Sequence, residues 1–333
     1  MILLILAIVP VLSIGIAFGS VSVPLGFTIR TLLDGLTGAL DPDSPMQQIV
    51  WNLRLPRTLG AFAVGAGLSI IGVAMQALVR NPLAEPYVLG VSGGASAGAS
   101  LFYMGLVPTF LASRIDISLA AFLGALLSIT IVYGVARGGG RLSVSRLLLA
   151  GVALAALMAA VSSFVTFASP DANKTRAVLF WLMGSFHSVQ WADLPLAAGV
   201  TLAGGLALFT LARPLDALLT GEDPARSLGI RVEVLKKTLI VLSALVTGLL
   251  VSISGAIGFV GLIIPHSVRS LVGVGHRWVL PVSFLAGGLF MVLADTLSQL
   301  VLPGQQLPVG IVTAVCGVPF FLVLLRRTDY QFK

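Results

Sequence analysis

Apolar runs long enough to cross a lipid bilayer recur along this chain of 333 residues. A helix rises 1.5 Å per residue, so about 20 apolar residues cross the roughly 30 Å hydrocarbon core. Backbone groups in lipid must find their hydrogen bonds within the segment, which makes each such run a helix. With 57% hydrophobic and only 10% charged residues, the composition lies outside the range of soluble domains. The sequence therefore predicts an all-α polytopic membrane protein, organised as one domain over residues 1–333.

Eight of these runs have clear boundaries: residues 2–23, 58–79, 87–106, 117–136, 147–168, 194–212, 279–302 and 308–325. We expect the first run to be a retained helix rather than a signal peptide, because no Lys or Arg precedes Arg30. Residues 238–265 carry no charge and are compatible with one long helix or with two helices broken at "SISGAIG" (252–258).

The distribution of basic residues distinguishes these two topologies, because Lys and Arg concentrate in cytoplasmic loops. With two helices over 238–265 and a cytoplasmic N-terminus, 14 of the 20 basic residues lie on the cytoplasmic side. With one helix there, only nine do. The balance predicts about ten transmembrane helices, with both termini in the cytoplasm. The cytoplasmic segments are then 79–86, 137–146, 213–237 and 265–277.

Residues 213–237 carry nine charges within 25 residues, in a chain that is otherwise poor in charge. Glu222 and Asp223 suit the positive end of a helix dipole, and Pro224 suits a first turn. Gly229 is a typical residue just past a helix end. The pattern predicts a short rigid helix that presents a surface to a soluble partner.

The sequence offers no support for an enzyme. The dipeptide Gly-Lys never occurs, which excludes a Walker A phosphate loop in this chain. The three His residues and the single Cys have no metal-ligand spacing. We expect no metal or cofactor in this chain, and the net charge of +7 needs no nucleic-acid partner because basic cytoplasmic loops explain it.

Asp295 is the only charged residue at depth in a predicted span. A charge in the bilayer interior is costly, so it is usually functional or partnered. Two interpretations stay open: the ion site of a secondary transporter, or a carboxyl that is neutral or bonded to Thr296 or Ser298. Gly94 and Gly98, spaced as GxxxG, predict close helix packing, with a pore-lining face as the alternative.

Several blocks of the chain resemble the permease subunits of bacterial ABC importers of the FecCD type. The matching segments are "RLPRTLGAFAVGAGLSIIGVAMQALVRNPLAEPYVLGVSGGASAG" (54–98), "SRLLLAGVAL" (145–154), "GEDPARSLGI" (221–230), "SGAIGFVGLIIPHSVR" (254–269) and "LPVGIVTAVCGVPFFLVLLRR" (307–327). The resemblance implies a ten-helix subunit that pairs with a second copy or a sister permease. It also implies two ATPase subunits that bind ATP and Mg, a substrate-binding protein, and cargo such as ferric siderophores, haem or cobalamin.

The resemblance also assigns roles to particular residues. Residues 222–229 match a coupling helix that sits in the ATPase: Glu222, Asp223, Pro224, Ala225, Arg226, Ser227, Leu228 and Gly229. Four residues match cytoplasmic gates: Asn81, Leu83, Val144 and Ser145. Arg54 and Arg57 match arginines that dock the binding protein, while Gln299 stands where relatives often carry a further arginine. His187, in "SFHSVQW" (185–191), is a candidate substrate contact.

We therefore expect the permease of an ATP-driven importer for an iron chelate, a ferric siderophore or haem, in the bacterial inner membrane. A cobalamin permease of the same family is the alternative cargo assignment. A secondary transporter that uses Asp295, or a membrane scaffold without transport of its own, would be a different class.

Overall fold

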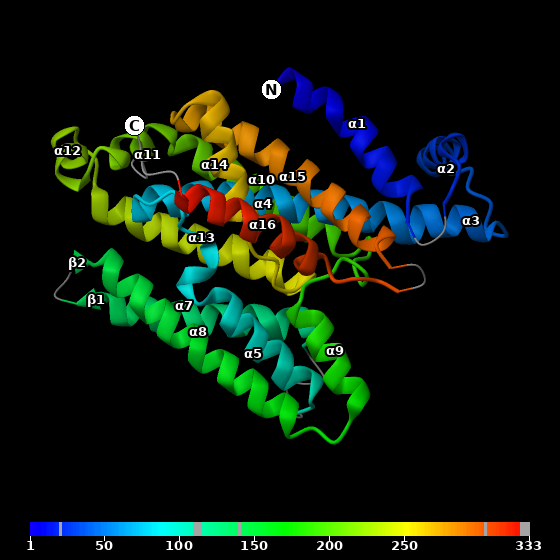
Figure 1. Ribbon diagram of the computed structural model, residues 1–333, viewed down its shortest axis with the longest axis horizontal. Coiled ribbons are helices and arrows are strands. Elements are labelled where there is room, and N and C mark those ends of the chain that lie inside the picture. The colour runs from blue at the N-terminus through cyan, green and yellow to red at the C-terminus, as the bar shows by residue number, and fades with distance from the viewer. Residues whose placement is uncertain (20–21, 109–114, 139–140, 303–304, 327–333) are drawn as a thin grey trace.

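The computed structural model describes residues 1–19, 22–108, 115–138, 141–302 and 305–326. These residues fold almost entirely into helices, and the long helices α4 (Leu55–Val79), α13 (Val232–Ser254) and α15 (His276–Leu300) run side by side (Figure 1).

In the first half of the chain the elements are α1 (Ile2–Ala17), α2 (Leu25–Thr37), α3 (Pro45–Gln48), a π-helical stretch (Ile49–Arg54), α4 (Leu55–Val79), a 3₁₀ turn (Pro86–Leu89), α5 (Val91–Tyr103), α7 (Ile117–Ala136), strands β1 (Arg137–Gly138) and β2 (Arg141–Leu142), and α8 (Val144–Phe167). In the second half they are α9 (Ala172–Leu182), α10 (Leu194–Thr210), α11 (Ala212–Leu219), α12 (Glu222–Ser227), α13 (Val232–Ser254), α14 (Val260–Val272), α15 (His276–Leu300) and α16 (Val309–Arg326).

Within the described ranges, each predicted apolar run contains a helix, and this part of the prediction is confirmed. The first predicted run is too long, because α1 ends at Ala17 rather than at residue 23. Among the described residues, five helices are long and apolar enough to cross a membrane, or six if α10 and α11, bent by 61°, form one span. The helices α1, α14 and α16 are apolar but shorter. The total of ten spans and the cytoplasmic termini stay predictions.

The uncharged stretch 238–265 is two helices, as the charge balance predicted. The first of them, α13, ends at Ser254, and α14 begins at Val260. Gly255 takes a φ of 69°, and a Cβ there would lie 2.2 Å from the Trp181 carbonyl oxygen. Phe259 takes a φ of 70°, which is costly for a bulky residue. The break therefore persists because surrounding contacts hold it.

Close contact between α5 and α7 confirms the packing role of the GxxxG pair. A Cβ on Gly94 would lie 2.3 Å from the Gly124 carbonyl oxygen, and one on Gly98 would lie 2.3 Å from that of Ala120. The two helices pack at this distance because neither residue of the pair has a side chain. With α8 and α9 they form one layer beside the layer that contains α4, α13 and α15 (Figure 1).

Described elements from two of the predicted cytoplasmic segments, 137–146 and 213–237, lie at one end of the bundle. The β1–β2 hairpin, α11 and α12 lie at one end, and α2, α3 and α9 lie toward the other (Figure 1). This grouping agrees with the charge balance for the segments that carry the hairpin, α11 and α12.

Candidate coupling and docking sites

The short charged helix predicted at 222–229 is present as α12. Gly221, at a φ of 124°, precedes it, and Gly229, at a φ of 81°, follows it. Glu222 and Asp223 occupy its first turn and Arg226 its last, an arrangement that complements the helix dipole at both ends. Start and stop signals in the sequence thus fixed this element locally.

One side of α12 faces the protein and the other faces outward. Ala225 is fully buried and anchors the helix, whereas Leu228, just past its end, is 71% exposed. Arg226 donates to Glu222 (2.8 Å) and to Asp223 (2.6 Å). Surface ion pairs of this kind add little stability, but they hold the charged side chains in one arrangement. The result is a rigid projection with an exposed apolar residue beside charges, which suits docking in a protein cleft.

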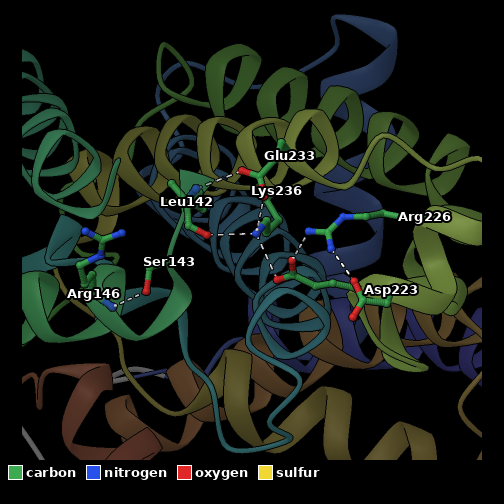
Figure 2. A network of polar contacts seen from close by, with 8 residues as sticks. Leu142, Ser143, Arg146, Asp223, Arg226, Glu233 and Lys236 are labelled. Carbon is green, nitrogen blue, oxygen red and sulfur yellow. Dashed lines mark hydrogen bonds and ion pairs between the residues drawn. The ribbon is translucent and has the colours of Figure 1, made fainter. Parts of the chain in front are cut away.

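A buried lysine joins α12 to two other elements (Figure 2). The Lys236 ammonium, on α13, lies 3.1 Å from a Glu222 carboxylate oxygen and 2.9 Å from that of Glu233. It also donates to the Leu142 carbonyl oxygen of β2 at 3.0 Å. Sequence reasoning missed this residue; the i, i+3 spacing of Glu233 and Lys236 was its only local signal.

The four predicted gate residues lie on two segments. Asn81 and Leu83 follow α4 in the loop before the 3₁₀ turn, where the Asn81 side-chain oxygen accepts from the Leu83 N–H at 2.9 Å. Val144 and Ser145 begin α8, directly after its N-cap Ser143. Ser145 is exposed and Val144 half-buried. Their gate role stays a prediction.

The loop that carries Asn81 and Leu83 continues into the helix break between α13 and α14. The Glu85 carboxylate accepts a hydrogen bond from the Phe259 N–H. The Tyr87 hydroxyl donates to the Ile257 carbonyl oxygen (2.8 Å) and accepts from its N–H (3.1 Å). Burial raises the pKa of Glu85 to about 7, although the Phe259 N–H opposes the shift. The gate loop and the break therefore form one bonded unit.

At the opposite end, Asp295 forms a buried ion pair with Arg57. The guanidinium donates through Nε and Nη2 to the two carboxylate oxygens at 2.8 Å each, and Gln299 donates to the same carboxylate at 3.0 Å. The expectation that Thr296 or Ser298 would satisfy this carboxyl was wrong. Their hydroxyls donate to the backbone oxygens of Val292 and Asp295, because those carbonyls lie one turn back on the same helix.

The two arginines predicted to dock a binding protein are both only 8% exposed. Arg54 donates to the carbonyl oxygens of Ile16 (3.0 Å) and Ala17 (2.8 Å), which end α1. Arg57 is held by Asp295 and also donates to Gln306 at 3.3 Å. Both guanidiniums thus bind acceptors of this chain, and their docking role stays a prediction.

His187 is exposed and lines a cavity of about 250 Å³ between α9 and the end of α13. Tyr103, Phe180 and Trp181 supply aromatic walls to the same cavity. No group of three potential metal ligands occurs among the described residues. The substrate-contact role of His187 stays a prediction.

Comparison with known proteins identifies the scaffold that carries these sites. The model of the FecCD transport family matches residues 3–327. The chain is 42% identical to the cobalamin import system permease of Halobacterium salinarum, over 86% of this chain and 75% of that one. It is 37% identical to the hemin transport system permease of Yersinia pestis, over 98% and 97% of the two chains.

A solved structure gives the same result for the fold. An inward-facing ABC transporter, described as of the metal-chelate type, matches with a TM-score of 0.82 at 31% identity. The match covers 97% of each chain. The helical arrangement is therefore that of a permease over its whole length.

Proposed function

This chain belongs to the FecCD transport family, and from that premise we propose that it is the membrane-spanning subunit of an ATP-driven importer for an iron chelate. It works with two ATPase subunits, which bind ATP and Mg, and with a substrate-binding protein on the outer side. A second copy of the chain or a sister permease completes the pore. The assembly resides in the bacterial inner membrane, and both termini of this chain are cytoplasmic.

The observation that carries this proposal is α12. A permease without a phosphate-binding loop of its own must receive energy through contact with its ATPase. A rigid helix that projects Leu228 and a fixed set of charges beyond the bundle is suited to that contact. When ATP closes the ATPase dimer, an element seated in each half moves with it.

The cargo assignment rests on what two relatives of this chain are named for. A relative that matches nearly the whole chain is named for hemin, which supports an iron chelate. Cobalamin is the second candidate, because a relative with higher identity over a shorter segment is named for it. The secondary-transport alternative loses its basis, because the Asp295 carboxylate is already paired with Arg57.

The test is transport by the complete assembly in proteoliposomes, with haemin, a ferric hydroxamate siderophore and cyanocobalamin offered in turn. We expect ATP hydrolysis and uptake to rise together with haemin or the siderophore. A rise with cyanocobalamin alone would replace the iron-chelate assignment by the second candidate. Uptake by the permease without its ATPase would overturn the importer assignment.

A further inference from the structure

We propose that Lys236 is a positioning residue that transmits movement of α12 to the start of α8, where Val144 and Ser145 stand. The inference rests on the proposed function, because it assumes that an ATPase moves α12. It adds the internal link between that helix and the predicted gate.

The first argument is that Lys236 uses its full bonding capacity to join three elements. An ammonium has three N–H donors, and three acceptors lie within 3.1 Å: Leu142 of β2, Glu222 of α12 and Glu233 of its own helix α13 (Figure 2). The residue is only 2% exposed. A buried ammonium must keep its acceptors, because an unpaired buried charge is costly. Movement of Glu222 therefore acts on Leu142 through one shared atom.

The second argument is that Leu142 is held at both of its backbone groups. Its carbonyl oxygen accepts from Lys236, and its N–H donates to the second carboxylate oxygen of Glu233 at 3.0 Å. The hairpin itself pairs only Arg137 with Leu142 and Gly138 with Arg141. Side chains of α13 thus add two hydrogen bonds at Leu142 to a ladder of two residue pairs.

The third argument is the distance along the chain from Leu142 to the gate. Ser143 follows as the N-cap of α8, and its hydroxyl accepts from the Arg146 N–H at 3.4 Å. Val144 is the first helical residue and Ser145 the second. Displacement of Leu142 therefore passes directly to the first turn of α8, because no flexible linker intervenes.

A second contact at the same end of the bundle connects α11 to α15 and does not involve β2 or α8. Asp216 of α11 bonds the His276 ring and backbone N–H at the start of α15, at 2.6 and 2.8 Å. That contact joins α11 to α15. Only the Lys236 contact joins α12 to β2 among the hydrogen bonds found in the described ranges.

The test uses the complete assembly in proteoliposomes, with the cargo that stimulates the wild type. Lys236→Met removes the three donors but keeps most of the side-chain volume. We expect ATP hydrolysis to stay within about twofold of wild type while uptake per ATP falls about tenfold, a typical size for one coupling contact. Lys237→Met is the matched control: Lys237 lines a cavity with Tyr133 of α7 and Val234 of α13, and its variant should couple normally.

A double variant distinguishes the loss of one path of contacts, shared by Glu222 and Lys236, from a general loss of stability. Glu222→Gln and Lys236→Met interrupt the same path, so together they should lower uptake per ATP no further than the single Lys236 change. The proposal is overturned if Lys236→Met couples as wild type, or if it lowers hydrolysis and uptake in equal proportion. If the wild type shows no cargo-dependent ATP hydrolysis, the proposed function is wrong, and so is the proposed transmission of movement through Lys236.

Discussion

The buried ion pair between Arg57 and Asp295 makes a quantitative prediction for the variant Asp295→Asn. The carboxylate accepts two charge-assisted hydrogen bonds of 2.8 Å, and the side chains are 9% and 5% exposed. Asparagine keeps the shape but turns an NH₂ group toward one guanidinium donor, so Arg57 is left buried without its counter-charge. Removing one partner of a buried pair costs about 3–5 kcal/mol.

The assay is thermal unfolding of the purified permease in detergent, followed by the fluorescence of its four tryptophans. At about 2–4 °C per kcal/mol for chains somewhat shorter than this one, the variant should melt on the order of 10 °C below the wild type. Replacing both residues together, as Arg57→Met with Asp295→Leu, should recover most of the loss, because well-packed apolar pairs substitute for buried ion pairs.

The matched control is Thr296→Val, which removes a hydroxyl that donates only to the Val292 carbonyl oxygen. It should lower the melting temperature by no more than about 3 °C, since the net contribution of such a bond is about 1 kcal/mol. If Asp295→Asn melts within 2 °C of wild type, its loss is no larger than the ~1 kcal/mol of one ordinary hydrogen bond, and the reasoning is refuted. A fall in melting temperature in Thr296→Val as large as that in Asp295→Asn would also refute it.

Two further predictions concern the helix packing and the gate loop. Gly94→Val should prevent close approach of α5 and α7, because a Cβ would lie 2.3 Å from the Gly124 carbonyl oxygen. Size-exclusion chromatography of this variant should show little monodisperse protein. The control Gly134→Ala should be tolerated, because a Cβ at Gly134 would have no heavy atom of another described element within 4 Å. Burial raises the pKa of Glu85 from 4.5 to about 7. Between these two pH values the folded protein therefore holds a proton on Glu85 that the unfolded chain has lost, and the free energy of unfolding falls as the pH rises through this range. Glu85→Gln keeps an acceptor for the Phe259 N–H and should flatten this dependence; a melting curve that changes equally with pH in both proteins would contradict it.

Local signals in the sequence were sufficient to predict α12 and to place the break between α13 and α14. The start and stop residues of α12 are neighbours along the chain, and its helix follows from them. The break between α13 and α14 followed from charge balance, and "SISGAIG" marked its place because Gly255 permits the required φ.

The partners of buried charges could not be predicted in the same way. Arg57 and Asp295 are 238 residues apart, and only the packing of α4 against α15 brings them together. Lys236 bonds a backbone carbonyl 94 residues earlier, and a backbone atom leaves no pattern of residue types to recognise. The sequence offered Thr296 and Ser298 as neighbours of Asp295, but helical carbonyls one turn back satisfy their hydroxyls first.

The most direct test of the account is whether α12 touches the ATPase in the assembled transporter. A photo-cross-linking amino acid placed at Leu228, which is 71% exposed beside α12, is compared with one at Leu36, which is 80% exposed on α2 at the opposite end. We predict an adduct between the permease and its ATPase subunit from position 228 and none from position 36. Absence of the adduct at 228 from an assembly that hydrolyses ATP would contradict the account, as would equal adducts from the two positions.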